Sequence, residues 1–254
     1  MFRLFSEWLI EGKALMLNED QRAFAREVSQ AMKDWIENTP DDEKDKLPGL
    51  PLSNYDYEDF PIIYEREVYG NKDPKTGVSR QMHVAVHMAA SENPYQGAPS
   101  AYADAYNVEF DRGRMMVCVQ RWTQTSQMQY TLPKGLEGVI EHELVHIFDP
   151  KFNPAQLPSH ERDRWKVQQT FSSKVGTTAD AKGDLHYGQT PWEQDAGMYQ
   201  RARRTIQKYK DRGWEFDGKH MPQDDWERAW KTRPEQWKKY LRTLYHMAKE
   251  EGLI

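Results

Sequence analysis

Two histidines and a glutamate within residues 142–146 have the types and spacing of a metal-assisted hydrolytic site. His142 and His146 are four residues apart, so in a helix both imidazoles lie on one face, about one turn from each other. Imidazoles placed in this way can bind the same zinc ion. Glu143 lies one position along, where its carboxylate can take a proton from a zinc-bound water whose pKa the metal lowers to about 7. The three residues therefore indicate zinc-assisted hydrolysis.

The chain around these three residues is strongly apolar. The flanking apolar side chains are Val139, Ile140, Leu144, Val145, Ile147 and Phe148. Such a segment predicts a helix buried on most of its surface. Two histidines and a glutamate are costly in that environment unless other groups compensate them. A metal ion supplies that compensation, and a hydrogen-bonded pair of core histidines is the alternative.

The decapeptide VIEHELVHIF resembles the active-site helix of the zincin metallopeptidases. Their pattern is a small or β-branched residue, an uncharged one, any residue, HE, two uncharged residues, H and two apolar ones, and this segment fits every position. The resemblance implies a zincin-like metalloprotease fold, in which a small β-sheet precedes a buried active-site helix. It also implies a Zn²⁺ cofactor bound by His142 and His146, with Glu143 as the general base that acts on a protein or peptide substrate.

A catalytic zinc needs a third protein ligand. Metzincins continue with a glycine and a third histidine, but this chain continues with Asp149-Pro150. In the glutamate-zincins, or gluzincins, the third ligand is a glutamate on a later helix, often followed three residues on by alanine. Glu193 and Ala196 are similar, so the resemblance implies Glu193 as the ligand. The family often has an acid directly after that alanine, where this chain has Gly197.

Other assignments of the third ligand stay open. Thr190 and Glu193 also have the spacing of a capping box, in which Glu193 bonds the backbone of Thr190. His160 follows the second histidine of the helix by fourteen residues, about the distance found in SprT-like proteases, which act on DNA-bound protein. The glycine that follows in that family is absent here. Asp149 and Asp195 are further candidates, as ligands or as carboxylates that orient a histidine.

Two further pairs of residues have chemistry to offer. His186 and Tyr187 come just before the expected ligand helix and could donate a hydrogen bond to a tetrahedral oxyanion. Packing of these loop residues on the core is the alternative. His83 and His87 would share one face of a strand, where packing or surface exposure is favoured over a second metal site.

Composition bounds the class of protein. The chain has 254 residues, 38% of them hydrophobic, and a formal net charge of −5, which suits a globular protein with one large domain or with a compact domain plus an appendage. The single cysteine, Cys118, excludes an intrachain disulfide and the Cys-rich zinc ribbon of SprT-like proteases. No segment approaches the roughly 20 apolar residues of a membrane span. Glu7 and Glu11 interrupt the apolar opening, so we expect no signal peptide and a cytoplasmic location.

The elements that must position His142, Glu143 and His146 are a helix, several strands and a second helix, which is an α+β pattern. Apolar residues at helical spacing predict a helix over 21–38, followed by a charged, Pro-rich connector. Strand-like runs over 62–70 and 79–90 predict a hairpin, and two more runs flank an expected turn at 111–113. The helix over 135–148 then bears the triplet.

These elements divide into three expected segments. Residues 1–60 form the N-terminal helix and connector, 61–198 the zincin-like catalytic core, and 199–254 a helical Trp-rich extension packed on the core as a single domain. The basic extension could meet phosphates and stack bases. Trp226 and Trp230 are four apart, however, as on a packed helix face, so we do not expect nucleic acid or a membrane as a partner.

The residues favour a zinc-dependent metallopeptidase that hydrolyses peptide bonds. One alternative is an SprT-like protease acting on nucleoprotein, which predicts salt-sensitive binding to nucleic acid. The other is a non-enzymatic structural protein, of viral type, that kept a zincin-like core. Glu143→Gln separates this last class from an enzyme, because the substitution removes the expected base alone.

Overall fold

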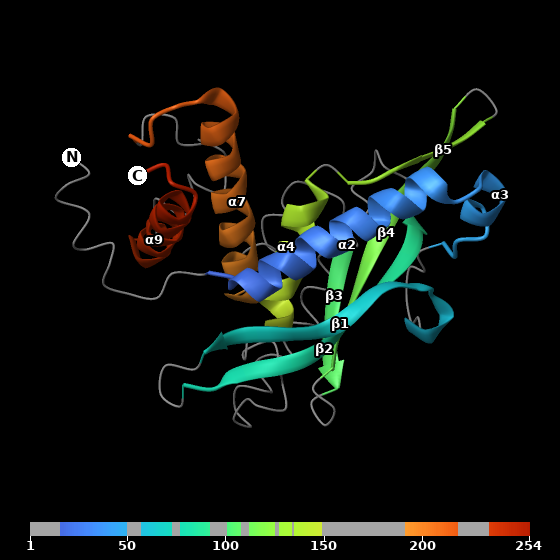
Figure 1. The fold of residues 1–254 in the computed structure, drawn as a ribbon, viewed down its shortest axis with the longest axis horizontal. Coiled ribbons are helices and arrows are strands. Elements are labelled where there is room, and N and C mark those ends of the chain that lie inside the picture. The colour runs from blue at the N-terminus through green and yellow to red at the C-terminus, as the bar shows by residue number, and fades with distance from the viewer. Residues whose placement is uncertain are drawn as a thin grey trace. The chain divides into compact units, whose positions relative to one another are not determined.

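The computed structural model describes residues 16–49, 57–72, 77–91, 101–107, 112–124, 127–133, 135–148, 191–217 and 234–254. The chain divides into two compact units, one of Leu17–Asp184 and one that contains the C-terminal helices. Helices and strands both contribute to the first unit (Figure 1). The expected α+β class is therefore confirmed.

The first unit has helices at both ends of its described part and strands between them. In chain order its elements are α2 (Glu19–Asn38), α3 (Asp41–Lys44), the 3-10 turn η1 (Tyr57–Asp59), β1 (Ile62–Lys72), β2 (Ser79–Ser91), β3 (Ala101–Asn107), β4 (Arg112–Gln124), β5 (Gln127–Thr131) and α4 (Leu136–Phe148). The helices expected over 21–38 and 135–148 are thus confirmed as α2 and α4. None of the helices that the structure describes, in either unit, has the length and apolar character needed to cross a membrane.

The strands form one mixed sheet of order β1-β2-β4-β3, and β5 pairs with the second half of β4. β1 and β2 are antiparallel, which confirms the expected hairpin. β2 and β4 are parallel, with His83 opposite Arg112 and Ser91 opposite Gln120. β3 runs antiparallel to β4 and is the last strand on that side of the path. Side chains alternate between the two faces along each strand, so the register decides which residues share a face.

α2 begins with a capping box and packs beside β1. The Asn18 side chain accepts from the Gln21 N–H, and the Gln21 side chain accepts from the Asn18 N–H, both at 2.9 Å. This arrangement satisfies two N–H groups that a helix start leaves without an intrahelical partner. Arg66 of β1 donates to Asp20 and Glu27 of α2 at 2.8 and 2.7 Å. The apolar face of the helix is buried at Phe24, Ala25, Val28 and Met32.

α4 packs on the same sheet face as α2, and two glycines allow its close approach. A Cβ at Gly113 of β4 would lie 2.8 Å from Cγ2 of Ile147, and one at Gly70 of β1 would lie 2.8 Å from Cδ1 of Phe148. The sequence predicts a turn at 111–113, and this prediction is wrong at Arg112 and Gly113, which lie within β4. Glycine is used here for contact with the helix, not for a turn.

Two elements were not expected from the sequence. α3 lies in the segment predicted to be an exposed connector, and β5 lies where no strand was predicted. Leu47 is buried just after α3. The guanidinium of Arg121 on β4 donates to the carbonyl of Asp45 at 3.2 Å, and the hydroxyl of Tyr130 on β5 is hydrogen-bonded to the Asp45 carboxylate. Contacts between segments far apart in the chain therefore hold this corner together.

The described part of the second unit contains α7 (Pro191–Arg212) and α9 (Pro234–Glu250), which pack on each other. Arg203 and Lys210 of α7 both pair with Glu251, at 2.8 and 2.6 Å, and Lys239 of α9 pairs with Asp195 at 2.6 Å. α7 runs through the segment boundary expected after residue 198, because its apolar side chains keep helical spacing across it. The buried ones are Ala196, Met198, Tyr199, Ala202, Ile206 and Tyr209.

Candidate metal centre

His142 and His146 converge on α4. Their Nε2 atoms are 3.2 Å apart, and their rings meet edge to face with centroids 4.9 Å apart. Two nitrogen ligands at the usual 2.0–2.1 Å from a tetrahedral zinc are roughly 3.3 Å from each other. The pair therefore fits two positions of a zinc site. The same distance suits a hydrogen bond between one protonated and one unprotonated Nε2, so metal content distinguishes the two arrangements.

The polar residues of α4 are buried to different degrees. Glu141, Glu143 and His146 are buried, with 1%, 6% and 3% of their surface exposed, while His142 is half-buried. The Nδ1 atoms of both histidines are buried, which leaves Nε2 as the atom that each ring turns toward the other. Glu143 adds a buried carboxylate on the same helix as the two imidazoles, and a carboxylate is a suitable general base for a metal-bound water.

Glu143 acts electrostatically on the neighbouring strand. Burial, together with the negative charge of Glu143, raises the pKa of the Cys118 thiol on β4 from 9.0 to about 12. The thiol is therefore protonated at neutral pH, whereas zinc binds the thiolate form of cysteine. Cys118 also packs in an apolar cluster with Phe60, Ala89 and Met116.

The structure does not bring a third ligand to the two histidines within the part of the chain that it describes. Among the described side chains, no group of three or more His, Cys, Asp and Glu residues could hold a metal ion. Glu193 is the third residue of α7, the position that both the ligand and the capping-box assignments give it. His160, Asp149, His186 and Tyr187 lie outside the described residues.

Asp195, the other acid considered on α7, is engaged within its own unit. Its carboxylate accepts from Lys239 Nζ at 2.6 Å, and the side chain is 13% exposed. A partly buried ion pair loses much of its stability when one partner is removed or diverted. The Asp195 carboxylate is thus already engaged by a cation of its own unit.

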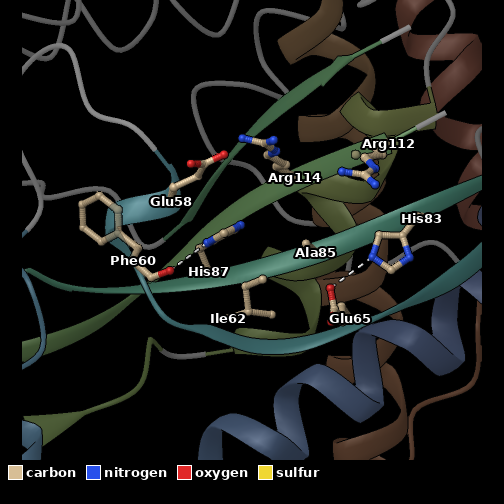
Figure 2. A pocket seen from close by; sticks show the side chains of 10 residues that line it. Glu58, Phe60, Ile62, Glu65, His83, Ala85, His87, Arg112 and Arg114 are labelled. Atoms are coloured by element: carbon tan, nitrogen blue, oxygen red, sulfur yellow. Dashed lines mark hydrogen bonds and ion pairs between the residues drawn. The ribbon is translucent and has the colours of Figure 1, made fainter. Parts of the chain in front are cut away.

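His83 and His87 lie on one face of β2, as their spacing predicts, and each has a partner (Figure 2). His83 Nε2 is 3.1 Å from Oε2 of Glu65. The buried His87 donates from Nδ1 to the carbonyl of Phe60 at 3.1 Å. This face also carries Arg112 of β4, which the sequence did not single out because its place opposite His83 depends on strand register.

Comparison with known proteins identified no relative of this chain. No family model, curated protein or solved structure matches the chain. Any assignment of function consequently depends on the residues of α4 and their geometry.

Proposed function

We propose that this chain is a zinc-dependent metallopeptidase of zincin-like fold, with His142 and His146 as metal ligands and Glu143 as general base. The observation that carries the proposal is the 3.2 Å separation of the two Nε2 atoms on a buried helix. Glu193 is the proposed third ligand, because it lies in the first turn of a later helix while Asp195 is held by Lys239.

The arrangement of sheet and helix supports the same proposal. Among the described strands, β3 lies at one end of the sheet; it is antiparallel to β4 and contacts α4. The zincin resemblance implies an edge strand near the active-site helix that aligns the substrate backbone. An extended peptide can add to such an edge through backbone hydrogen bonds.

Each residue has a defined task in the proposed reaction. Zinc, when bound, supplies a Lewis acid that polarises the peptide carbonyl and acidifies water. Glu143 accepts a proton from the water as its oxygen bonds to the carbonyl carbon. When the C–N bond breaks, Glu143 returns that proton to the leaving amine. The Glu143 side chain is buried, so its carboxylate has few orientations open to it.

Metal content and proteolysis together test the proposal. We expect about one zinc per chain by elemental analysis and loss of that zinc in His142→Ala, which changes a half-buried side chain. Glu143→Gln should keep the zinc and the circular dichroism spectrum but lower the cleavage of an unfolded protein substrate by about 100-fold or more. A wild-type chain that fails to take up zinc contradicts the metal site. Equal cleavage by wild type and Glu143→Gln contradicts the assigned base.

A further inference from the structure

A second site lies on the sheet face opposite α4. A pocket of about 340 Å³ opens there over β1, β2 and β4, a size at the lower end of the roughly 300–1,000 Å³ found for small-molecule sites. The two sheet faces are distinguished by β4, since Gly113 faces Ile147 of α4. Arg112 and Arg114 flank that glycine, and their side chains therefore extend to the other face and line the pocket (Figure 2).

Strand register makes the pocket hollow. His83 and His87 stand at its two ends on β2, and Ala85 lies between them. Ala85 is opposite Arg114, and His83 is opposite Arg112. A methyl group at position 85 leaves the space that a larger side chain would fill.

The lining of the hollow carries charges of both signs. Arg112 and Arg114 are two residues apart on β4, so their side chains extend from the same strand face toward the pocket. A guanidinium fork matches the oxygen atoms of a carboxylate or phosphate. Glu58 from η1 lies on the Arg114 side of the pocket, and Glu65 from β1 lies on the His83 side (Figure 2). Opposite charges are thus presented to the same small volume.

We propose that this pocket binds a small zwitterion, with its oxyanion on Arg112 and Arg114 and its ammonium group facing Glu58 or Glu65. A simple anion complements only half of the lining, because the two carboxylates repel it. The wall formed by the buried Phe60 and His87 lowers the local dielectric and strengthens both charge contacts. The site is separate from the metal centre and does not depend on it.

Calorimetric titration of the full-length chain with two probes of similar length tests the proposal. β-Alanine offers a carboxylate and an ammonium group, and ethanolamine phosphate offers a phosphate and an ammonium group. We expect saturable binding of at least one of them at constant ionic strength. Preference for β-alanine identifies an amino-acid-like ligand, and preference for ethanolamine phosphate identifies a phosphorylated amine. Acetate and inorganic phosphate, which lack the ammonium group, should bind more weakly.

Four variants, each checked for folding by circular dichroism, locate the binding. Arg112→Gln and Arg114→Gln should each weaken it by about tenfold or more, and Ala85→Leu should abolish it by filling the hollow without changing a charge. Arg204→Gln removes a charge from an exposed position of α7 and should leave binding unchanged. Arg112 is exposed, so its variant tests the site even where Arg114→Gln disturbs the sheet. No binding of either probe at tens of millimolar, or equal affinity in all four variants, overturns the proposal.

Discussion

Two acids only two positions apart on α7 have different expected roles. Asp195 is paired with Lys239 at 2.6 Å, whereas Glu193 is the proposed zinc ligand. Glu193→Gln should therefore lose most of the bound zinc, because an amide is a poor zinc ligand. Asp195→Asn is the matched control, and it should keep the zinc while weakening the contact to α9. Elemental analysis of both variants decides between them, and zinc lost only in Asp195→Asn would reverse the assignment.

The single cysteine offers a test of burial within β4. The pKa of Cys118 is about 12 in the folded chain against an ordinary 9.0, so at pH 9 an unfolded thiol is about half ionised and the folded one almost wholly protonated. We expect a thiol reagent at pH 9 to label folded Cys118 slower than the urea-unfolded chain, by two orders of magnitude or more. The unfolded chain loses this proton between pH 9 and 12 while the folded chain keeps it. Stability should therefore fall as pH rises through that interval, and less so in Cys118→Ala.

More residues of the candidate metal centre than of the pocket could be predicted from the sequence. His142 and His146 belong to one helix, and their spacing of four fixes that they share a face whatever the rest of the fold does. Glu193 could be suggested only by resemblance, because its distance to the pair depends on how separate segments fold. Arg112 and Arg114 gave no signal, because an alternating pair of arginines acquires meaning only when register places it opposite His83 and Ala85.

At the scale of elements, the contact between α4 and β4 depends on the lack of a side chain at Gly113. A Cβ there would lie 2.8 Å from Ile147, so Gly113→Ala should destabilise the chain by roughly 1–3 kcal/mol. Gly138→Ala on α4 is the matched control, because nothing lies within 4 Å of its Cβ. It should stabilise the chain by up to about 1 kcal/mol through better helix propensity.

Urea unfolding measures both changes. The double variant Gly113→Ala with Ile147→Ala should be more stable than the sum of the single effects, because the second substitution removes the atoms that clash. Full additivity would show that Gly113 does not meet Ile147. A destabilising Gly138→Ala would show that this side of α4 is covered.

Local patterns predicted some elements and missed others for a physical reason. α2 and α4 show their apolar period and their end signals within a single stretch of sequence, such as Asn18 before α2. α3 and β5 meet through Asp45, which contacts Arg121 and Tyr130 at separations of 76 and 85 residues. No local period encodes such contacts, and tertiary structure overrides weak propensity.

At the scale of the whole molecule, Glu251, which follows α9 directly, pairs with two basic residues of α7. Hydrogen bonds from Lys210 and then Arg203 lower the pKa of Glu251 below 4.5. This group therefore contributes stability above pH 4.5, and the contribution is lost as the pH falls through the lowered value. Glu251→Gln should cost about 1 kcal/mol at pH 7, and less at a pH below the lowered pKa of Glu251. Thermal unfolding at the two pH values checks this, and an equal loss at both would show that packing is the cause.

The same ion pairs bear on nucleic-acid binding. Arg203, Lys210 and Lys239 are matched by acids of their own unit. We therefore expect no binding of a fluorescent DNA duplex in 150 mM salt, and only weak binding in 50 mM salt. Affinity that is strong and falls steeply with salt would favour the nucleoprotein-directed alternative.

The parallel pairing of β2 with β4 bears on how the sheet forms during folding. Antiparallel neighbours can close through a tight turn, but parallel strands need a longer connection that returns the chain, and pairings of this kind slow folding. All five described strands precede α4 in the chain, so a ribosome delivers the sheet before the helix that bears His142 and His146. The proposed zinc ligands His142 and His146 thus lie on a helix that is synthesised after every described strand of the sheet on which it packs.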